Sequence, residues 1–460
     1  MEVVNKPFAG RNALMKTLET AVTDIWFELL SEFSGRFTGP GYSKFVCLTS
    51  GSVLAERRPL VTEIVTAASM ENNWRAVEWF MENGRWPEDQ IEHKLSAKAS
   101  VHCKFKGRNI WALDDTKVYK TGKKIWGTCS YHEYTSRCSN RPETVWGHNW
   151  VICGGLSRGE GQMFLPTCAR LYMRESQMPD GETFRKKPEM AVELLRLCAT
   201  ESDGADLAVF DGAYAVRSVV RPLLSPPIEE PRVDFLTRLR IDSKLHQEPP
   251  PRRPGKNGRP RKWGKRLAAP AEAENWPSKW QKTTAVIYGK KRPVLYKKVY
   301  CQWAPAGDKA RVNAFAFKIQ GYKNPWYLVC SDLDLCPEDV MEIYAARFCQ
   351  EDAHRDLKQL CGFGTGQGRL KNVVIRTMQL RLIEMTLLRI LSTQLGQIQE
   401  ERWWPKPPWY RQKKRGSLRD VKHLLKEALR DFSRFDLESS NIGKVDGEAA
   451  NEAYGGKKAA

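Results

Sequence analysis

The sequence predicts an α/β protein, and three observations support this class. Short apolar runs typical of β-strands end in acidic residues, as in NIWALDDT at 109–116 and DLAVFDGAY at 206–214. Segments with an apolar residue at every third or fourth position, the period of an amphipathic helix, lie between and after these runs. The chain has 460 residues, of which 41% are hydrophobic, so several domains can each bury a core.

Residues 1–100 predict a separate helical domain. Two short helix patterns, at 59–69 and 73–83, flank a polar joint. The apolar side of the second pattern consists of Trp74, Val77, Phe80 and Met81. Such a pair of helices is compatible with a helix-turn-helix that binds DNA and equally with an ordinary helical bundle, and both interpretations stay open.

Residues 101–230 predict the first part of an α/β core. Its strand patterns lie at 111–116, 124–133 and 146–156. A helix with proline in its first turn follows at 188–199, and an apolar strand then ends at Asp211. Three strands, a helix and a fourth strand are therefore expected in this order.

A mainly β insertion is predicted at 231–325. The 140 residues that separate Asp211 from Glu351 are far more than one crossover needs, so this stretch must contain structure of its own. Its strand patterns lie at 283–288, 294–303 and 312–319.

The insertion opens with a basic run, PPPRRPGKNGRPRKWGKR at 249–266, which has eight Lys or Arg and no acidic residue. Its Gly-Arg-Pro triplet at 258–260 resembles the core of an AT-hook, an extended arm that lies in a narrow minor groove and is attracted by its negative potential. Arg259, Arg261 and Lys262 are therefore candidate DNA-binding residues. A solvated basic loop is the plainer interpretation of the same run.

Residues 326–398 predict the second part of the core. A strand is expected at 326–332, a helix opens near Pro337, and a long apolar-striped helix follows at 370–395. Residues 399–460 predict a basic, proline-rich linker, one further helix and a tail.

The segment YAARFCQEDAHRDLK contains Tyr344, Arg347, Glu351 and Lys358. Offsets of three, seven and fourteen residues from the tyrosine predict that all four lie on one face of an α-helix. A carboxylate between two cations and a phenol is suited to a metal ion beside a phosphodiester, because Glu ligates Mg²⁺ while the others hold phosphate oxygens. The alternative is a solvated helix face with charge pairs.

Acidic residues also stand where two apolar strands end. Asp114 and Asp115 close the first, and Asp211 closes the later one. Active sites of open α/β sheets gather at the carboxyl ends of strands, so these residues and Glu351 are expected to converge. For any one aspartate, a turn or N-cap residue is the simpler explanation.

Together these residues resemble the DDE transposases of insertion sequences, which are marked by a Tyr, two residues, Arg, three residues, Glu, six residues, Lys signature. Tyr344, Arg347, Glu351 and Lys358 fit this spacing without a gap. The resemblance covers about residues 100 to 395. It implies an RNase H-like core interrupted by the β insertion, with an N-terminal helical DNA-binding domain and a C-terminal helical tail.

The resemblance implies two-metal phosphoryl transfer, with two Mg²⁺ or Mn²⁺ ions held by Asp114, Asp211 and Glu351. Related nucleases show aspartate, any residue, then Ser or Thr, which selects Asp114 and leaves Asp115 in reserve. The implied phosphate-binding residues are Tyr344, Arg347 and Lys358. The implied partners are double-stranded DNA, as terminal inverted repeats and target, and a second copy of the chain on paired ends.

In similar transposases an aromatic residue of the insertion stacks on a flipped or unpaired base. The candidates here are Trp263, Trp276, Trp280 and Trp303. Core packing is the alternative role, and for Trp303 it is the stronger one because this residue lies in a predicted strand.

Composition favours a nucleic-acid partner. There are 74 Lys and Arg against 54 Asp and Glu, a formal net charge of +20, and the sequence pI is about 9.4. With no apolar run of membrane-spanning length, we expect a cytoplasmic protein that associates with the nucleoid when bound to DNA. Two other functions fit the same residues: an RNase H-like endonuclease or resolvase without strand transfer, and a domesticated DNA-binding protein.

Overall fold

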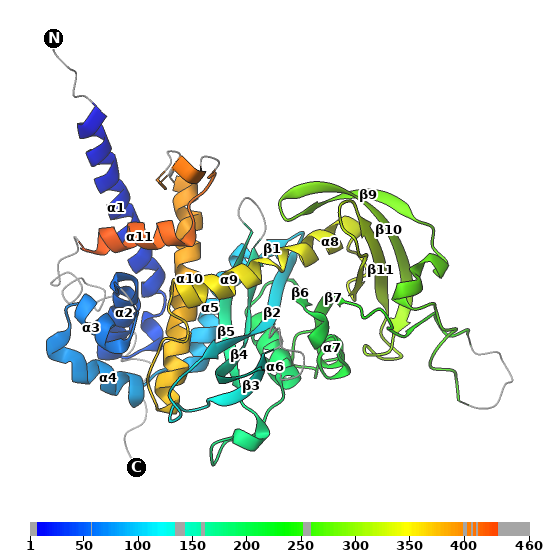
Figure 1. The fold of residues 1–460 in the computed structure, drawn as a ribbon, viewed down its shortest axis with the longest axis horizontal. Helices are drawn as coiled ribbons and strands as arrows, with labels where there is room; N and C mark the ends of the chain where they lie inside the picture. Colours follow the sequence, from blue (N-terminus) through cyan, green and yellow to red (C-terminus); the bar gives the residue numbers. More distant parts are fainter. Residues whose placement is uncertain are drawn as a thin grey trace, which may run out of the picture. The chain divides into compact units, whose positions relative to one another are not determined.

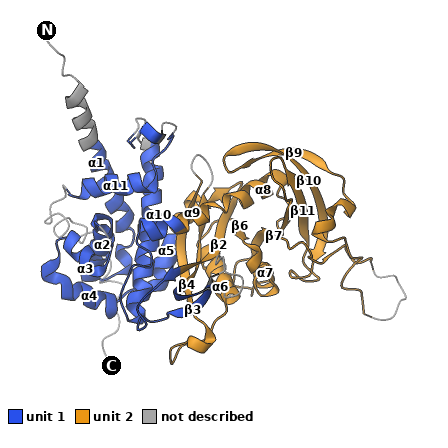
Figure 2. Ribbon diagram, in the orientation of Figure 1, with its two compact units in different colours: residues 1–95, 118–148, 355–460 blue, residues 96–117, 149–354 orange. Residues whose placement is uncertain are grey.

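The computed structural model describes residues 7–56, 58–133, 143–157, 162–251, 259–398, 403–405, 408–410 and 413–430. These residues form a mixed α/β protein with two compact units, coloured blue and orange in Figure 2. Unit 1 comprises residues 1–95, 118–148 and 355–460, and unit 2 comprises residues 96–117 and 149–354. No helix among the described residues is long and apolar enough to cross a membrane.

Unit 1 is mainly helical (Figure 1). Its helices are α1 (Pro7–Ser31), α2 (Gly39–Leu54), α3 (Val61–Ala67), α4 (Trp74–Glu82), α10 (Lys371–Ile398) and α11 (Leu418–Arg430), and short 3₁₀ turns lie at η1 (Ser34–Arg36), η2 (Glu71–Asn73) and η6 (Pro408–Tyr410). The long helix α10 packs on α1, α2, α4 and α11. A side chain at Gly51 of α2 would meet the Ile64 carbonyl at 2.7 Å, so glycine permits the close approach of α2 and α3.

A fully buried ion pair joins the helices of unit 1. Arg381 and Glu384 of α10 pair at 3.4 Å, and Lys422 of α11 donates to Glu384 Oε1 at 2.7 Å. Ser52 of α2 hydrogen-bonds to the same two α10 residues. Because buried charges are costly unless paired, this network fixes which faces of α2, α10 and α11 meet.

Unit 2 is built on a large sheet. Its strands are β1 (Lys104–Phe105), β2 (Arg108–Tyr119), β4 (Glu143–Ser157), β5 (Met163–Tyr172), β6 (Ala205–Phe210), β7 (Val233–Arg238), β8 (Leu245–His246), β9 (Gln281–Ile287), β10 (Lys290–Trp303), β11 (Val312–Ile319) and β12 (Trp326–Cys330). The helical elements are α5 (Glu88–His102), η3 (Glu175–Gln177), α6 (Lys187–Thr200), η4 (Gly212–Tyr214), α7 (Arg217–Leu224), η5 (Pro270–Asn275), α8 (Pro337–Ala346) and α9 (Cys349–Gln359). Both α5 and α9 have one end in unit 1, as do β2 and β4.

The strands of this sheet run in the order β5, β4, β2, β6, β7, β12, β11, β10. β5 is antiparallel to β4, whereas β6 is parallel to both β2 and β7. From β7 onward the neighbours are antiparallel. α6 packs on β5 and on α7, and α7 packs on β7.

The predicted mixed α/β class is confirmed, but the sequence does not predict β5, β7 or the short strands β1 and β8, and one predicted strand is too long. The sequence predicts a strand at 124–133, of which only β3 (Cys129–Glu133) forms, and it pairs with the start of β4. β5 contains Pro166, a residue that is unfavourable within a strand because it has no amide donor. Beside it, Cys153 pairs with Cys168 and Gly154 with Pro166, so Thr167 is the extra residue of a β-bulge in β5.

The prediction that Tyr344, Arg347, Glu351 and Lys358 lie on one face of a single α-helix is also wrong, since α8 and α9 are two helices. Arg347 and Phe348 form a turn between them. Within this turn the amides of Arg347, Phe348, Gln350 and Glu351 each donate to the carbonyl three residues earlier. Such bonds wind the chain more tightly than an α-helix does, so the signature residues do not share one regular face.

The predicted β insertion contains β9, β10 and β11 close to the expected positions, with β8 added to β10. Trp276 and Trp303 are buried, at 3% and 2% exposure, and take the packing role. Residues 252–258 of the basic run lie outside the described residues, including Gly258 of the AT-hook-like triplet.

Candidate active site

Asp114 and Asp211 come together because their strands are neighbours. β2 and β6 are parallel, and Leu113 of one is the register partner of Phe210 of the other. The next residues along the two strands are Asp114 and Asp211, so both carboxylates project from the same edge of the sheet. The two aspartates are therefore neighbours, as predicted, but only Asp211 follows the end of a strand. β2 continues to Tyr119, so Asp114 lies within its strand and the prediction that the strand ends at 116 is wrong.

Arg347, in the turn between α8 and α9, links two of the predicted acidic residues. Its Nη1 donates to Asp114 Oδ2 at 3.2 Å, and its Nη2 lies 3.5 Å from Glu351 Oε1. Its side chain is 14% exposed, and its Nε has no hydrogen-bond partner among the described residues. Burial lowers the pKa of Arg347, but Tyr344 and the carboxylates of Asp114, Asp211 and Glu351 outweigh burial and raise it.

The pKa of Asp114 reflects its burial first and the neighbouring charges second. Burial raises the pKa of Asp114 to about 6, and the charges of Asp115 and Asp211 act in the same direction. Arg347 and the backbone amide of Asp115 oppose this rise, and that amide donates to Asp114 Oδ1 at 2.8 Å. A carboxyl in this setting is favoured to accept a cation, since a cation removes the repulsion.

Asp115 projects to different partners. Its Oδ2 accepts from Lys187 Nζ of α6 at 2.7 Å, and its Oδ1 accepts from the Tyr214 hydroxyl at 3.1 Å. Burial, followed by the charges of Asp115 and Asp114, raises the pKa of Tyr214, so this phenol stays a proton donor. Asp115 is thus held by Lys187 and Tyr214, whereas Asp114 contacts Arg347 and lies within electrostatic reach of Asp211, which favours Asp114 as the ligand.

Glu351 is the most open of the three carboxylates, with 51% of its side chain exposed. The three predicted ligands share Arg347 as a neighbour, but they do not form a tight cage. Within the described part of the chain, only a cysteine cluster brings three ligand atoms within 4.8 Å of one another. The Arg347 guanidinium stands between Asp114 and Glu351. Its ion pair with Glu351 is long, at 3.5 Å, and half exposed to solvent, so breaking this pair costs little free energy.

Ion pairs from the sheet hold α8 beside this edge. Lys106 Nζ donates to Asp339 at 2.7 Å, and Arg108, at the start of β2, pairs with Asp332 just after β12. The edge strand β9 adds a bond from the Val286 amide to Glu342 of α8 at 2.9 Å. The turn that carries Arg347 is therefore anchored at the N-terminal side, through α8.

The other predicted site residues lie in different settings. Tyr344 packs edge-on against Trp326 at 5.8 Å between ring centroids, and the Arg347 guanidinium lies 5.8 Å from its ring. Lys358 lies on the last turn of α9, two turns after Glu351. Arg259 and Arg261 are exposed, whereas Lys262 pairs with Asp308 at 3.5 Å.

Three residues beside this edge were not found from the sequence. Arg238 ends β7, the strand next to the one that delivers Asp211, and its charge acts on the pKa of Tyr344. Tyr288 and Phe348 are 48% and 44% exposed, with ring centroids 5.4 Å apart. The position of Arg238 at a strand end is a signal that could have identified it, whereas nothing in the sequence pairs the two aromatic rings.

Tyr288 has an unusual backbone conformation. It occupies the turn between β9 and β10 with φ of +50°, and Gly289 follows with φ of +73°. Two positive φ angles define a tight hairpin turn that normally takes Asn or Asp before glycine. A bulky aromatic residue there is strained, and such strain persists most often where a side chain has a role.

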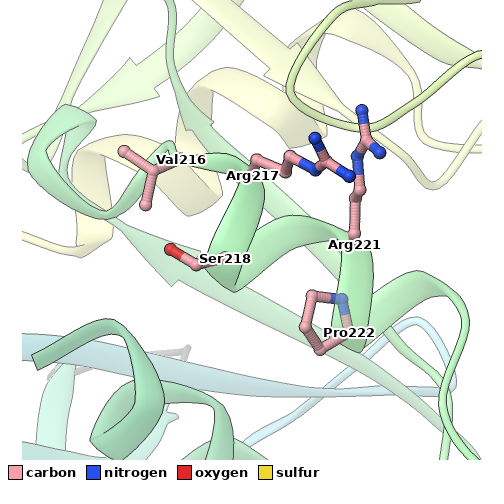
Figure 3. Close-up of a pocket in the computed structure, with 5 residues that line it drawn as sticks. All are labelled: Val216, Arg217, Ser218, Arg221 and Pro222. Atoms are coloured by element: carbon pink, nitrogen blue, oxygen red, sulfur yellow. The ribbon is translucent and has the colours of Figure 1, made fainter. Parts of the chain in front are cut away.

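A pocket of about 490 Å³ lies at the start of α7, a few residues after Asp211 (Figure 3). Arg217 and Arg221 both extend from this helix in Figure 3, and Arg221 donates to the carbonyls of Ala304 and Pro305. Arg221 thereby ties α7 to the insertion, and Arg217 adds a second positive charge to the lining of this pocket.

The fold and site define a class before any comparison is made: a mixed α/β protein in which adjacent parallel strands deliver two neighbouring aspartates, and an arginine stands between one of them and a glutamate. The model of the family described as "DDE superfamily endonuclease" matches residues 33–294, more than half of the chain. The chain belongs to this family. The match includes Asp114 and Asp211 and ends before Glu351.

No relative was found among the curated proteins. Among solved structures, the chain is similar to the NurA nuclease from Sulfolobus solfataricus, with 10% sequence identity and a TM-score of 0.26. The similarity covers 74% of this chain and 98% of that one. A TM-score this low does not establish a shared fold.

Proposed function

We propose that the protein is a DNA transposase that binds transposon ends, cleaves them and joins their 3′ ends to target DNA. The observation that carries this proposal is the arrangement around Arg347, which contacts Asp114 and Glu351 beside Asp211. Membership in the DDE endonuclease family supports DNA cleavage. The spacing of Tyr344, Arg347, Glu351 and Lys358 supports the finer assignment to transposases.

The strand order supports an RNase H-like core. Three strands, β2, β4 and β5, precede α6, and β6 then returns parallel to β2. The insertion between Asp211 and Glu351 contains β9 to β11. We place the domains at 1–100, 101–230, 231–325, 326–398 and 399–460.

The donor set of this edge fits hard divalent cations, because carboxylate oxygens are what Mg²⁺ and Mn²⁺ prefer. Asp114, Asp211 and Glu351 would hold them, and when bound the two ions activate the attacking hydroxyl or water and stabilise the leaving oxygen. The chain contributes the movement of Glu351, which leaves Arg347 and turns toward the aspartates. Arg347 is then free to bind a phosphate oxygen with its fork of donors.

Four basic or phenolic residues would bind the phosphates next to the cut. Arg347 and Tyr344 lie at the site, Arg238 lies at the neighbouring strand end, and Lys358 follows on α9. Arg259 and Arg261 would contact DNA further away, together with the N-terminal helices. Contacts of this kind set register on the duplex and carry most of the affinity.

The exposed pair Tyr288 and Phe348 offers an aromatic surface next to Glu351. Both rings are close to half exposed, unlike Trp276 and Trp303. We assign to Tyr288 the stacking role that the resemblance gives to an aromatic residue of the insertion. Stacking of a base on such a ring contributes about 1 to 3 kcal/mol.

The test uses the full-length protein with a duplex that carries the DNA flanking its own coding sequence, a circular target plasmid and Mg²⁺. We expect cleavage at a defined end and covalent joining of that end to the plasmid, detected by sequencing the junctions. Cleavage without junctions would favour the RNase H-like endonuclease or resolvase, and binding without cleavage would favour the domesticated DNA-binding protein. The Asp211→Ala and Glu351→Ala proteins should bind the duplex and produce neither product.

A further inference from the structure

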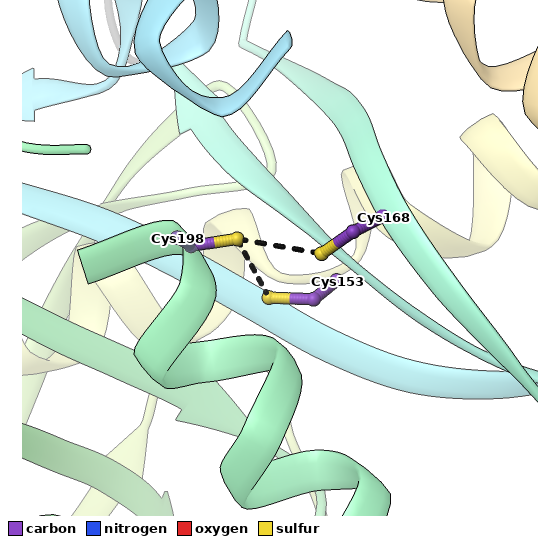
Figure 4. Close-up of side chains that lie close together, drawn as sticks. All are labelled: Cys153, Cys168 and Cys198. Carbon is purple, nitrogen blue, oxygen red and sulfur yellow. Dashed lines mark hydrogen bonds between the residues drawn. The ribbon is translucent and has the colours of Figure 1, made fainter. Parts of the chain in front are cut away.

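Three cysteines from three elements bring their thiols together in the core of unit 2 (Figure 4). Cys153 of β4 and Cys168 of β5 are register partners across the ladder, and Cys198 lies in the last turn of α6. Cys198 Sγ is 3.6 Å from the sulfur of each of the other two. All three sulfurs lie within 4.8 Å of one another, and all three residues are fully buried.

We propose that Cys153, Cys168 and Cys198 form a binding site for a thiophilic d¹⁰ cation of the Zn²⁺ class, separate from the carboxylate edge. Zinc binds thiolate sulfur at about 2.3 Å with tetrahedral angles, so sulfurs that share one zinc lie about 3.8 Å apart. The observed 3.6 Å is within a few tenths of an ångström of that spacing. The sulfurs of a disulfide would be about 2.0 Å apart.

Hydroxyl groups surround the sulfur at the centre of the cluster. Thr167 Oγ1 lies 3.4 Å from Cys198 Sγ and Ser96 Oγ lies 3.6 Å from it. Thr167 Oγ1 is also 3.6 Å from Cys168 Sγ, so it stands beside two of the three sulfurs. Both hydroxyls can donate to a thiolate, which stabilises negative charge on sulfur in a buried place.

Binding has a defined proton balance. Three S–H bonds break, three metal–sulfur bonds form, and three protons leave to solvent. The complex of one divalent ion with three thiolates then has a net charge of −1. Burial raises the pKa of Cys153 and of Cys168. Burial acts to raise the pKa of Cys198 as well. Hydrogen bonds from Cys153, Cys168, Thr167 and Ser96 outweigh the effect of burial, so the pKa of Cys198 is lowered.

The bound ion would join β4, β5 and α6 at a single point. This matters for unit 2 because α6 also begins with Lys187, which holds Asp115 next to Asp114. The sequence alone gives no sign of the cluster, since its members are 15 and 30 residues apart and match no common zinc module. The alternative is that the three cysteines are packed as small apolar residues without a ligand.

The test uses full-length protein produced in medium with added Zn²⁺, because buried thiols are most accessible during folding. Metal content is measured after gel filtration in a reducing buffer without Mg²⁺. We expect about one zinc per chain in the wild type, and a fall to below one fifth of that in the Cys198→Ala and Cys168→Ala proteins. The control is Cys301→Ala, which removes a fully buried thiol of β10 and should keep the wild-type zinc content.

X-ray absorption of the wild-type zinc protein gives a result that does not depend on any variant. Three sulfur neighbours at about 2.3 Å would support the site even if the cysteine variants fail to fold. A shell of oxygen and nitrogen alone would place the zinc elsewhere, including at the carboxylates, and would overturn the proposal. Wild-type protein with no zinc after expression in the supplemented medium would overturn it as well.

Discussion

Nη1 of Arg347 lies 3.2 Å from Oδ2 of Asp114, although 233 residues separate them in the chain. The guanidinium faces Glu351 as well, at 3.5 Å, and therefore stands between two carboxylates that would otherwise face each other. One positive charge in this position offsets the repulsion within an acidic cluster. The same group is placed to bind phosphate once the carboxylates have another cation.

Arg347→Lys tests whether the planar fork of donors is needed. Lysine keeps the charge but replaces the planar fork, whose donors point in fixed directions, with a compact ammonium on a flexible stem. We expect end cleavage to fall by about 10²-fold or more, as for other lost transition-state donors. Single-turnover cleavage at saturating protein is the measurement, with Arg240→Lys, an exposed pair partner of Asp242, as the matched control. A loss of less than threefold would show that the fork has no role in the reaction.

The second prediction separates two adjacent aspartates. Asp114→Asn should abolish cleavage and strand transfer, since it removes a ligand from the carboxylate edge. Asp115→Asn should keep measurable cleavage but lower the free energy of unfolding by about 1 to 3 kcal/mol, because Lys187 loses its charged partner. The two readouts are product formation on end DNA and urea unfolding. If the Asp114→Asn protein carries out strand transfer and the Asp115→Asn protein does not, the metal ligand is Asp115 and not Asp114.

The two aspartates of this edge could be predicted from the sequence, because the ends of apolar runs are marked by local pattern, although β2 itself continues past Asp114 to Tyr119. The apolar runs that end at Asp114 and Asp211 carry their own signal, and parallel pairing then brings the two residues together. The partners of Asp115 could not be predicted in the same way. Lys187 reaches it only because α6 packs over the sheet, which is a tertiary relation without a local signature.

The errors have equally specific causes. β5 contains Pro166, which disfavours a strand, and the strand forms with a bulge at the next residue, Thr167. The break between α8 and α9 was missed because residues 344–351 have good helical spacing and contain neither Gly nor Pro. Tyr288 was taken as the end of a strand, whereas it forms the turn with a positive φ that aromatic residues seldom adopt.

A third prediction concerns Arg238, which was not predicted from the sequence. Arg238→Ala should weaken DNA binding about equally for all sequences, because a phosphate contact reads no base. It should also reduce by about one the slope of the logarithm of the binding constant against the logarithm of salt concentration. Arg232→Ala is the control, because Arg232 lies just before the opposite end of the same strand and pairs with Asp234 at 2.9 Å. Binding is measured by fluorescence anisotropy over a series of salt concentrations. Equal effects of the two substitutions would remove Arg238 from the site.

A fourth prediction concerns pH and uses a buried carboxyl near the start of β6, at the opposite end of that strand from Asp211. Burial raises the pKa of Asp206 to about 6, although Ser202 and Trp111 donate to it. The folded protein therefore holds a proton that the unfolded chain has released, so the stabilising contribution of Asp206 is complete below about pH 4 and is lost as pH rises through 6.

Asp206→Asn should remove this dependence, since an amide oxygen still accepts both hydrogen bonds and never ionises. Relative to wild type, the variant should be more stable at pH 8 by on the order of 2 to 3 kcal/mol and gain nothing at pH 4. Urea unfolding of both proteins at the two pH values gives the difference. A variant that is less stable at pH 8 would show that the ionised carboxylate is favourable in the fold.

The last prediction separates strain from function at Tyr288. Asn adopts a positive φ more readily than Tyr, so Tyr288→Asn should leave the free energy of unfolding unchanged or raise it by up to about 1 kcal/mol. The same change removes an exposed ring beside Phe348 and should reduce cleavage of end DNA by about 5- to 150-fold, which corresponds to the energy of one stacked base. Tyr288→Phe keeps the ring and the strain, and it should retain most of the activity.

The measurements are urea unfolding and DNA cleavage. Cleavage is also measured on a duplex that has an unpaired base near the cut. If the ring stacks on the base, the Tyr288→Asn defect should be the same on this duplex; if the ring only opens the duplex, the defect should disappear. Wild-type cleavage by the Tyr288→Asn protein would mean that the aromatic pair has no part in handling DNA and that the strained turn serves the packing of β9 against α8 alone.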